Sequence, residues 1–128
     1  MNNNSKLCYK VIPLPCDTNY NGDVFGGWIL SQMDLAGIGL CSEVDHGRYV
    51  TVTIEKMVFK NPIKIGNGVE IYGKIIKIGN TSITIKLEVY SSNLNDGSVH
   101  EITEGIFKYV KIDSNRKPLS ITQRTDDL

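Results

Sequence analysis

The chain has 128 residues, and its 14 lysines and arginines are balanced by 14 aspartates and glutamates. This balance provides no overall field to recruit nucleic acid or an anionic membrane, so any anion site must come from local placement of basic side chains. No apolar run approaches the ~18 residues of a membrane span, and the first residues, MNNNSKLC, lack the apolar segment of a secretory signal. Cys8, Cys16 and Cys41 are odd in number and show no C-x-x-C spacing, which predicts reduced thiols in a cytoplasmic protein.

The predicted strands follow one another without internal repeats or a domain linker. Residues 1–6 are expected to be flexible, residues 7–118 to form a single domain, and residues 119–128 to form a polar tail. A short first strand is predicted over residues 6–12, and it ends at Pro13, which has no N–H to donate. Four more strands, separated by turns rich in glycine and asparagine, are predicted over residues 49–60, 69–78, 83–90 and 101–112. The apolar phase of the strand at 49–60 changes after Ile54, which predicts a β-bulge near Glu55 and Lys56.

One helix is predicted between the first strand and the other four. Small and apolar residues recur at helical spacing and form a single stripe: Ile29, Met33, Ala36, Gly37 and Leu40. The helix is expected to begin at residues 25–27 and to end at Val44, with Gly47 as a left-handed C-cap. Gly37 and Gly39 would each weaken an isolated helix by about 1 kcal/mol, so we expect close packing on a sheet. The predicted fold class is therefore α+β, with one long central helix wrapped by a curved antiparallel β-sheet.

A polar loop runs directly into the start of this helix in the segment DTNYNGDVFGGWILSQMD, residues 17–34. Backbone N–H groups at a helix start are unpaired and carry the positive end of the helix dipole, and Gly26 and Gly27 leave them open to a ligand. Asp23, just before them, is a candidate to activate water or to attack a carbonyl while the amides hold the oxyanion. Asn21 is a further candidate, for holding the loop or a water molecule. The residues alone leave a structural alternative open, in which Asp23 is an N-cap or turn residue.

A resemblance to a known family is carried by three stretches: PLPCDTNYNGDVFGGWILSQMD, HGRYVTVTIEKMVF and ITEGIFKYVKID, spread between about Cys8 and Pro118. The sequence resembles the YciA-type acyl-CoA thioesterases of the hotdog-fold superfamily, and N-G-D-x-F-G-G is its most specific part. The resemblance implies a hotdog fold and hydrolysis of acyl-CoA by a metal-free homo-oligomer, at least a dimer and in this family a trimer of dimers. It implies that Asp23 is the catalytic carboxylate, as general base or as nucleophile through an anhydride. Coenzyme A is then part of the substrate and product, and no separate cofactor is expected.

Coenzyme A carries phosphates, so its site is expected to include basic side chains at a rim of the fold. The candidates flank Pro62 or follow the last strand: Lys60, Lys64, Lys111, Arg116 and Lys117. A turn made by Gly79, Asn80, Thr81 and Ser82 is similar to the family's Gly-Thr-Thr-Ser turn, which lines the pantetheine arm. Asn80 departs from the usual threonine, and a simple β-turn without a ligand is the alternative interpretation.

Other chemistries fit the sequence less well. Cys16 adjoins the loop and is the one plausible thiol nucleophile, but neither His46 nor His100 accompanies it in the sequence. The His, Cys, Asp and Glu residues show no metal-ligand spacing, so no metal is expected. Two non-enzymatic alternatives stay open: an acyl-CoA-binding regulatory module on the same fold, and an interaction protein built on open sheet edges. Asp23 argues against the binding module, because a carboxylate gains nothing beside an anionic ligand.

Overall fold

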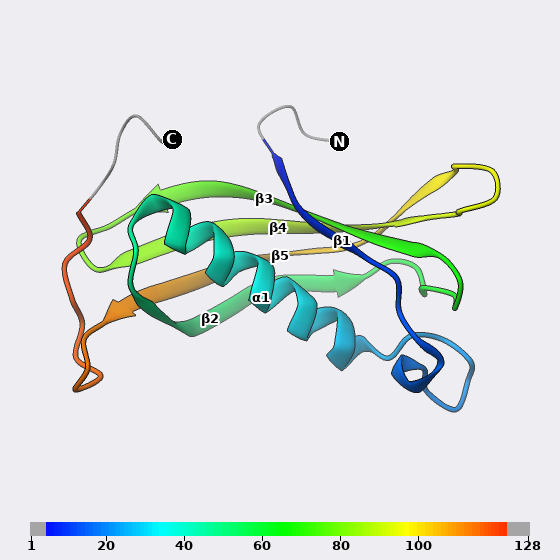
Figure 1. Ribbon diagram of the computed structural model, residues 1–128, viewed down its shortest axis with the longest axis horizontal. Helices are drawn as coiled ribbons and strands as arrows, with labels where there is room; N and C mark the ends of the chain where they lie inside the picture. Colours follow the sequence, from blue (N-terminus) through cyan, green and yellow to red (C-terminus); the bar gives the residue numbers. More distant parts are fainter. Residues whose placement is uncertain (1–4, 123–128) are drawn as a thin grey trace.

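The computed structural model describes residues 5–122 as one α-helix and a single five-stranded sheet (Figure 1). In chain order the elements are β1 (Lys6–Val11), a short 3₁₀ helix η1 (Pro15–Asp17), α1 (Gly26–Val44), β2 (Arg48–Phe59), β3 (Gly68–Ile78), β4 (Ser82–Ser92) and β5 (Val99–Ile112). The helix and the five strands expected from the sequence are all present. Their ends differ from the predicted ones by no more than about two residues.

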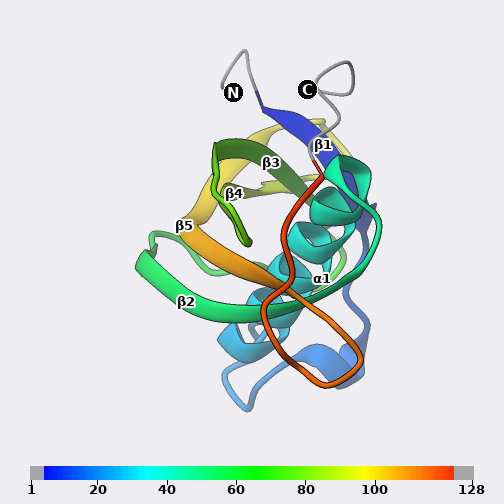
Figure 2. The same cartoon turned by 90° about the vertical axis from the view of Figure 1, so that its left-hand side faces the viewer.

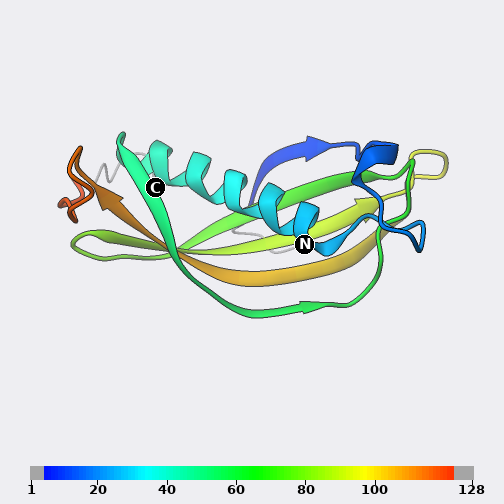
Figure 3. The same ribbon diagram turned by 90° about the horizontal axis from the view of Figure 1, so that it is seen from below.

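The sheet has the strand order β1-β3-β4-β5-β2, and every neighbouring pair is antiparallel. It curls around α1, which lies along its concave side (Figures 2 and 3). The strand that follows the helix, β2, pairs with the last strand, β5, while β1 pairs with β3 on the other side. Both β1 and β2 are therefore edge strands. This arrangement confirms the predicted α+β fold with a wrapped central helix.

The apolar stripe of α1 forms the centre of the core. Its buried members are Ile29, Met33, Ala36, Gly37, Leu40, Cys41 and Val44. They face the alternating inner residues of β4 and β5, such as Leu87 and Phe107, which are fully buried. A polar cluster ties the same helix to two strands, because Asp34 Oδ1 accepts hydrogen bonds from Thr51 Oγ1 at 2.7 Å and from the Tyr109 hydroxyl at 3.1 Å. The helix is thus fixed on the sheet by both packing and directional contacts.

The end of α1 differs from the predicted left-handed cap. Asp45 is the C-cap residue: its N–H donates to Cys41 O at 3.1 Å, and its backbone is extended. Gly47 lies two residues further on, so the prediction of Gly47 as the cap was wrong. Lys111 holds the helix end instead, because its buried ammonium nitrogen lies 2.5 Å from Asp45 Oδ2. A contact between distant segments replaces the local glycine cap.

The predicted bulge in β2 is confirmed. The pairing register between β2 and β5 shifts between Glu55 and Val58. Lys56 lies within this shift and has a left-handed φ of 58°. The extra residue changes the side-chain alternation, so that Met57 packs against the core while Val58 is exposed. The bulge therefore explains the change of apolar phase seen in the sequence.

Residues next to the predicted domain boundaries at 7 and 118 also contact the sheet. Lys6 already pairs with Gly73 in the sheet. At the other end, the Leu119 N–H donates to Lys111 O and the Ile121 N–H donates to Asn80 O, both at 2.8 Å. Residues 119–122, predicted as part of a polar tail, therefore pack across one end of the sheet. The rest of the N-terminal segment predicted to be flexible, residues 1–4, and of the predicted polar tail, residues 123–128, lies outside the described residues.

Candidate functional site

A cleft of about 360 Å³ lies beside the start of α1. Asn19 and Asp23 line it from the preceding loop, Gly26 from the first helical turn, and Phe59 and Lys60 from the end of β2. Of the predicted catalytic residues, Asp23 and Gly26 line the cleft directly, and Gly27 follows in the same helical turn. The loop, the helix start and a distant strand end thus meet around one cavity.

The segment that follows β2 binds Asp23 and the residue after it. Lys64 Nζ donates to Asp23 Oδ1 at 2.6 Å, and the two residues also form an isolated β-bridge. The next residue, Val24, is buried, and its N–H donates to Ile63 O at 3.0 Å. Within residues 5–122 no donor contacts Asp23 Oδ2. One carboxylate oxygen is therefore occupied, and the other can accept a proton from water.

Asn19 closes the loop that presents Asp23. Its side-chain Oδ1 accepts hydrogen bonds from the N–H groups of Asn21, at 2.9 Å, and Asp23, at 3.2 Å. Gly22 supplies a left-handed φ of 83°, which this turn requires at its fourth position. The Asn21 side chain is exposed and makes no hydrogen bond to the rest of the described chain. The sequence suggested Asn21 for holding the loop or a water molecule, but the hydrogen bonds that close the loop are made by Asn19. The available signal was an Asx residue three positions before a glycine.

The helix start leaves amide groups open beside the cleft. The N-cap residue is Phe25, whose side chain makes no capping hydrogen bond. In the described part of the chain the N–H groups of Gly26 and Gly27 have no acceptor, while those of Trp28 and Ile29 bond to Phe25 O. A Cβ on Gly26 would lie 3.5 Å from the Phe59 ring, and one on Gly27 would lie 3.3 Å from the Phe25 ring. Glycine therefore keeps space around the two donors that an oxyanion would need.

The predicted coenzyme A residues fall into two groups at opposite ends of α1 (Figure 1). Lys60 and Lys64 lie near Asp23, and both are ion-paired: Lys60 Nζ is 2.5 Å from Glu101, and Lys64 bonds to Asp23 itself. Lys111 pairs with Asp45 at the far helix end and is almost completely buried, so it does not present a free charge at a rim. Lys64 and Lys111 thus have structural partners that their positions in the sequence did not indicate.

The turn of Gly79, Asn80, Thr81 and Ser82 lies in the second group, at the end of α1 away from Asp23. Thr81 O accepts a hydrogen bond from the Lys111 N–H at 2.9 Å, and the Gly79 N–H donates to Ser82 O at 2.7 Å. Arg116 and Lys117 follow β5 at the same end. Within one chain, none of these residues is brought to the cleft.

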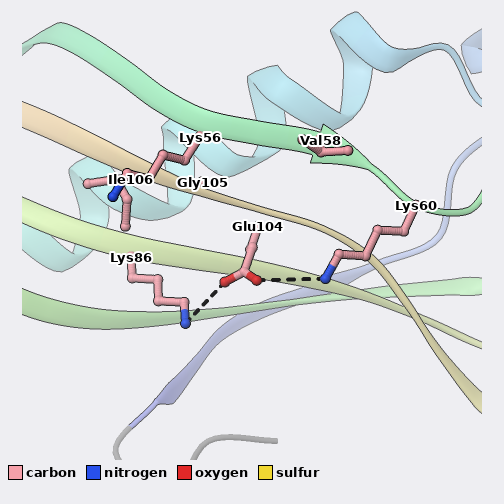
Figure 4. A pocket seen from close by; sticks show the side chains of 7 residues that line it. All are labelled: Lys56, Val58, Lys60, Lys86, Glu104, Gly105 and Ile106. Atoms are coloured by element: carbon pink, nitrogen blue, oxygen red, sulfur yellow. Dashed lines mark ion pairs between the residues drawn. The ribbon is translucent and has the colours of Figure 1, made fainter.

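A second cavity, of about 370 Å³, lies over β2, β4 and β5 on the side of the sheet away from α1 (Figure 4). Glu104 lies between two lysines there, 3.0 Å from Lys86 and 3.7 Å from Lys60. The hydrogen bond from Lys86 lowers the pKa of Glu104, and the same contact raises the pKa of Lys86. These two lysines have carboxylate partners, whereas Lys56, which also lines the cavity, has no ion pair among the described residues. The cavity is lined by β2, the residue after it, β4 and β5 and borders no helix start, so it lacks the open amides that the cleft beside Asp23 offers.

The cysteines and the possible metal ligands do not form a second reactive centre. Cys16 is exposed, and its sulfur lies 3.8 Å from Asp17 Oδ1. Burial raises the pKa of the Cys41 thiol to about 12, which keeps it protonated. Among residues 5–122 there is no group of three or more His, Cys, Asp or Glu side chains arranged to hold a metal ion. No helix in that range is long and apolar enough to cross a membrane.

Comparison with known proteins identifies the family of the chain. The family model of the thioesterase superfamily matches residues 21–97. The acyl-CoA thioester hydrolase YciA of Escherichia coli (strain K12) is 41% identical over 118 residues, which are 90% of this chain and 89% of the relative.

Two solved structures extend the likeness to the fold. A hexameric thioesterase from Yersinia pestis is 39% identical, with a TM-score of 0.89 over 94% of this chain and 98% of that chain. A hexameric hotdog-fold thioesterase of Campylobacter jejuni is 35% identical, with a TM-score of 0.88 over 94% of this chain and 93% of that chain. The chain therefore belongs to the thioesterase superfamily and, within it, to the YciA-type thioesterases with the hotdog fold.

Proposed function

We propose that this chain hydrolyses acyl-CoA thioesters to a free carboxylic acid and coenzyme A. The observation that supports this most directly is that the Asp23 carboxylate and the open amide of Gly26 border the same cleft. Family membership supports the substrate class, because the Escherichia coli relative is named an acyl-CoA thioester hydrolase. The reaction consumes only water besides the thioester, so the proposal includes no separate cofactor. The free thiols of Cys8, Cys16 and Cys41 support the proposed cytoplasmic location.

In the proposed reaction the thioester carbonyl lies between Asp23 and the helix start. The N–H groups of Gly26 and Gly27 stabilise the negative charge that develops on the carbonyl oxygen. Asp23 accepts a proton through Oδ2 from the water that attacks the carbonyl, or it attacks the carbonyl itself and forms an anhydride that water then opens. In both routes the C–S bond breaks and the thiolate of coenzyme A leaves. The two routes share the same residues and differ in whether Asp23 becomes acylated.

We propose that the active form is a homo-oligomer, a hexamer assembled from dimers. Large apolar side chains on the segments around the cleft are exposed in a single chain: Leu14, Tyr20, Phe25, Phe59 and Ile65. The turn at residues 79–82 and the basic residues after β5 can reach an Asp23 only in another copy. The relatives from Yersinia pestis and Campylobacter jejuni are hexameric. Light scattering combined with an activity assay tests the assembly, and an active monomer would contradict it.

The activity is tested by incubating the purified protein with acyl-CoAs of several chain lengths and a thiol-detecting reagent. Saturable release of free thiol supports a thioesterase. Saturable binding without release would indicate an acyl-CoA-binding module, and neither response would favour an interaction protein. Cys16 is exposed and would itself react with the reagent, whereas Cys8 is partly buried and Cys41 is buried, so the Cys16→Ser variant is the form in which this background is lowest. Loss of turnover in that variant would point to Cys16 as the nucleophile in place of Asp23.

A further inference from the structure

The turn that carries Asp23 occurs a second time in the molecule, after β5. Over residues 113–117, Asp113 Oδ1 accepts hydrogen bonds from the N–H groups of Asn115, at 2.8 Å, and Lys117, at 3.0 Å. The Asp113 N–H donates to Lys117 O at 2.9 Å. Asn19 makes the same three hydrogen bonds to the second and fourth residues after it, at 2.9, 3.2 and 2.7 Å. An Asx side chain thus closes both five-residue turns in the same way.

The two turns also agree in their backbone. The fourth residue is left-handed in each, with φ of 83° at Gly22 and 64° at Arg116. A β-bridge joins the residues on either side of each turn, which are Thr18 and Val24 in one and Ile112 and Pro118 in the other. The same type of turn therefore occurs at two places in the described chain. Of the two, only the turn at residues 19–23 contributes residues to the cleft.

In the turn at residues 19–23, the first residue, Asn19, fixes the backbone of the fifth residue, Asp23. Both the N–H and the C=O of Asp23 bond to Asn19: the N–H to the side-chain oxygen and the C=O to the backbone N–H. Asn19 also lines the cleft. Removal of its side-chain oxygen would release two N–H groups and allow Asp23 to move relative to the helix amides.

We propose that Asn19 is a positioning residue for Asp23, an inference that rests on the thioesterase function proposed above. Asp113 demonstrates that aspartate closes the same turn, so the turn alone does not require asparagine. An aspartate at position 19 would, however, place a second carboxylate in the cleft beside Asp23. The neutral amide supplies the required acceptor without like-charge repulsion of either Asp23 or the anionic substrate.

The kinetic test compares Asn19→Ala and Asn19→Asp, with acyl-pantetheine as the substrate so that contacts to the nucleotide do not contribute. Asn19→Ala removes the acceptor, and we expect kcat to fall by about tenfold to a hundredfold with little change in KM, as for a misplaced catalytic group. Asn19→Asp keeps the acceptor and the turn, so its kcat should stay closer to that of the wild type. A kcat of Asn19→Ala within about twofold of the wild type would overturn the proposal.

The matched control is Asp113→Ala, which removes the same hydrogen bonds from the second turn. It should lower the melting temperature by an amount similar to that seen in Asn19→Ala while leaving kcat on acyl-pantetheine within about twofold of the wild type. An equal fall in kcat in both variants would mean that the loss reflects general destabilisation, which would also overturn the proposal. If Asn19→Ala does not fold, Gly22→Ala takes its place in the kinetic test. It strains the same turn through the left-handed φ of residue 22, without a steric clash, because a Cβ there meets no other atom within 4 Å.

A measurement without substrate separates this inference from the proposed activity. Amide hydrogen exchange followed by NMR should show faster exchange at Asn21 and Asp23 in Asn19→Ala than in the wild type or in Asn19→Asp. Unchanged protection of these amides in Asn19→Ala would overturn the positioning role, whether or not the protein hydrolyses thioesters. Faster exchange together with a wild type that releases no thiol would leave the positioning intact and reject the proposed function.

Discussion

A Cβ atom added to Gly37 would lie 2.0 Å from the hydroxyl oxygen of Tyr109. Gly37 of α1 thus lies directly against Tyr109 of β5, and the Tyr109 side chain is completely buried. The Tyr109 hydroxyl also donates to Asp34 Oδ1, one turn earlier on the same helix. The ring cannot move aside without losing that hydrogen bond, so glycine at position 37 is a requirement of packing.

Gly37→Ala and Gly39→Ala should therefore change stability in opposite directions. The clash at Gly37 should cost about 1–3 kcal/mol, and more where the helix has to shift. A Cβ on Gly39 meets no atom within 4 Å, so this second substitution should gain about 0.5–1 kcal/mol from helix propensity. Thermal or urea unfolding of the two variants measures both effects. Equal stability of the two variants would show that Tyr109 yields without cost.

Asp23→Asn tests the proposed chemistry. The change preserves size and turn preference and removes a negative charge near an anionic substrate, so substrate binding should stay the same or tighten. The chemical step should lose the general-base contribution of roughly 10²–10⁴ in rate. Steady-state kinetics should then show a fall in kcat without a rise in KM. A folded, oligomeric variant with kcat within about threefold of the wild type would reduce Asp23 to a loop-shaping residue.

Ionic strength tests the expected phosphate contacts. If Lys60, Lys64, Arg116 or Lys117 hold the phosphates of coenzyme A, added salt should raise KM for acyl-CoA by about threefold or more, because screening weakens exposed charge pairs. Acyl-pantetheine lacks the nucleotide and should show little change. The same salt response for both substrates would remove these residues from the coenzyme A site. Lys111 is not expected to contribute, since it is buried against Asp45.

The three cysteines should differ strongly in reactivity. Burial raises the pKa of the Cys41 thiol to about 12 and also raises the pKa of Cys8. Since the thiolate is the reactive form and a raised pKa keeps the thiol protonated up to higher pH, an alkylating reagent at pH 8 should modify exposed Cys16 first. Mass spectrometry after a short reaction should find the label on Cys16, and on all three cysteines after unfolding. Early labelling of Cys41 would indicate that the core around α1 opens readily.

Lys56→Gly should stabilise the protein. A left-handed conformation costs a residue with a Cβ roughly 1–2 kcal/mol, and Lys56 adopts it at the β2 bulge. Glycine removes most of this strain, partly offset by its greater freedom in the unfolded chain. Lys56→Ala keeps the strain and is the matched control. A glycine variant no more stable than the alanine variant would show that the bulge is relaxed with lysine.

Features set by near neighbours in the chain could be predicted from the sequence. The helical stripe that includes Met33 and Leu40 and the change of phase after Ile54 each depend on a few adjacent residues, and both appear where they were expected. The number of long strands around a single glycine-containing helix also restricted the fold to a wrapped sheet. The position of Asp23 just before a helix start without a side-chain cap could also be predicted, because it depends only on the order of residues in the loop and the first helical turn.

Contacts between distant segments could not be predicted in the same way. Lys64 reaches Asp23, and Lys111 reaches Asp45, because the folded sheet brings those segments together. These two lysines, which the sequence analysis treated as free charges for binding phosphate, therefore form ion pairs with aspartates in the structure. The role of Asn19 was missed for a different reason: its hydrogen bonds are local, and its spacing of three residues from Gly22, which Asn21 does not share, was a signal that the prediction did not use.

The pairing of β2 with β5 determines when this chain can fold. Arg48, at the start of β2, pairs with Ile112, at the end of the last strand. During synthesis β2 leaves the ribosome well before its partner, with Val52, Ile54 and Val58 on a strand that has no neighbour on either side. Such non-local pairing slows folding, and an unpaired apolar strand is prone to aggregate. We therefore expect the nascent chain to depend on chaperones until β5 has emerged, and expression at low temperature to favour the native protein.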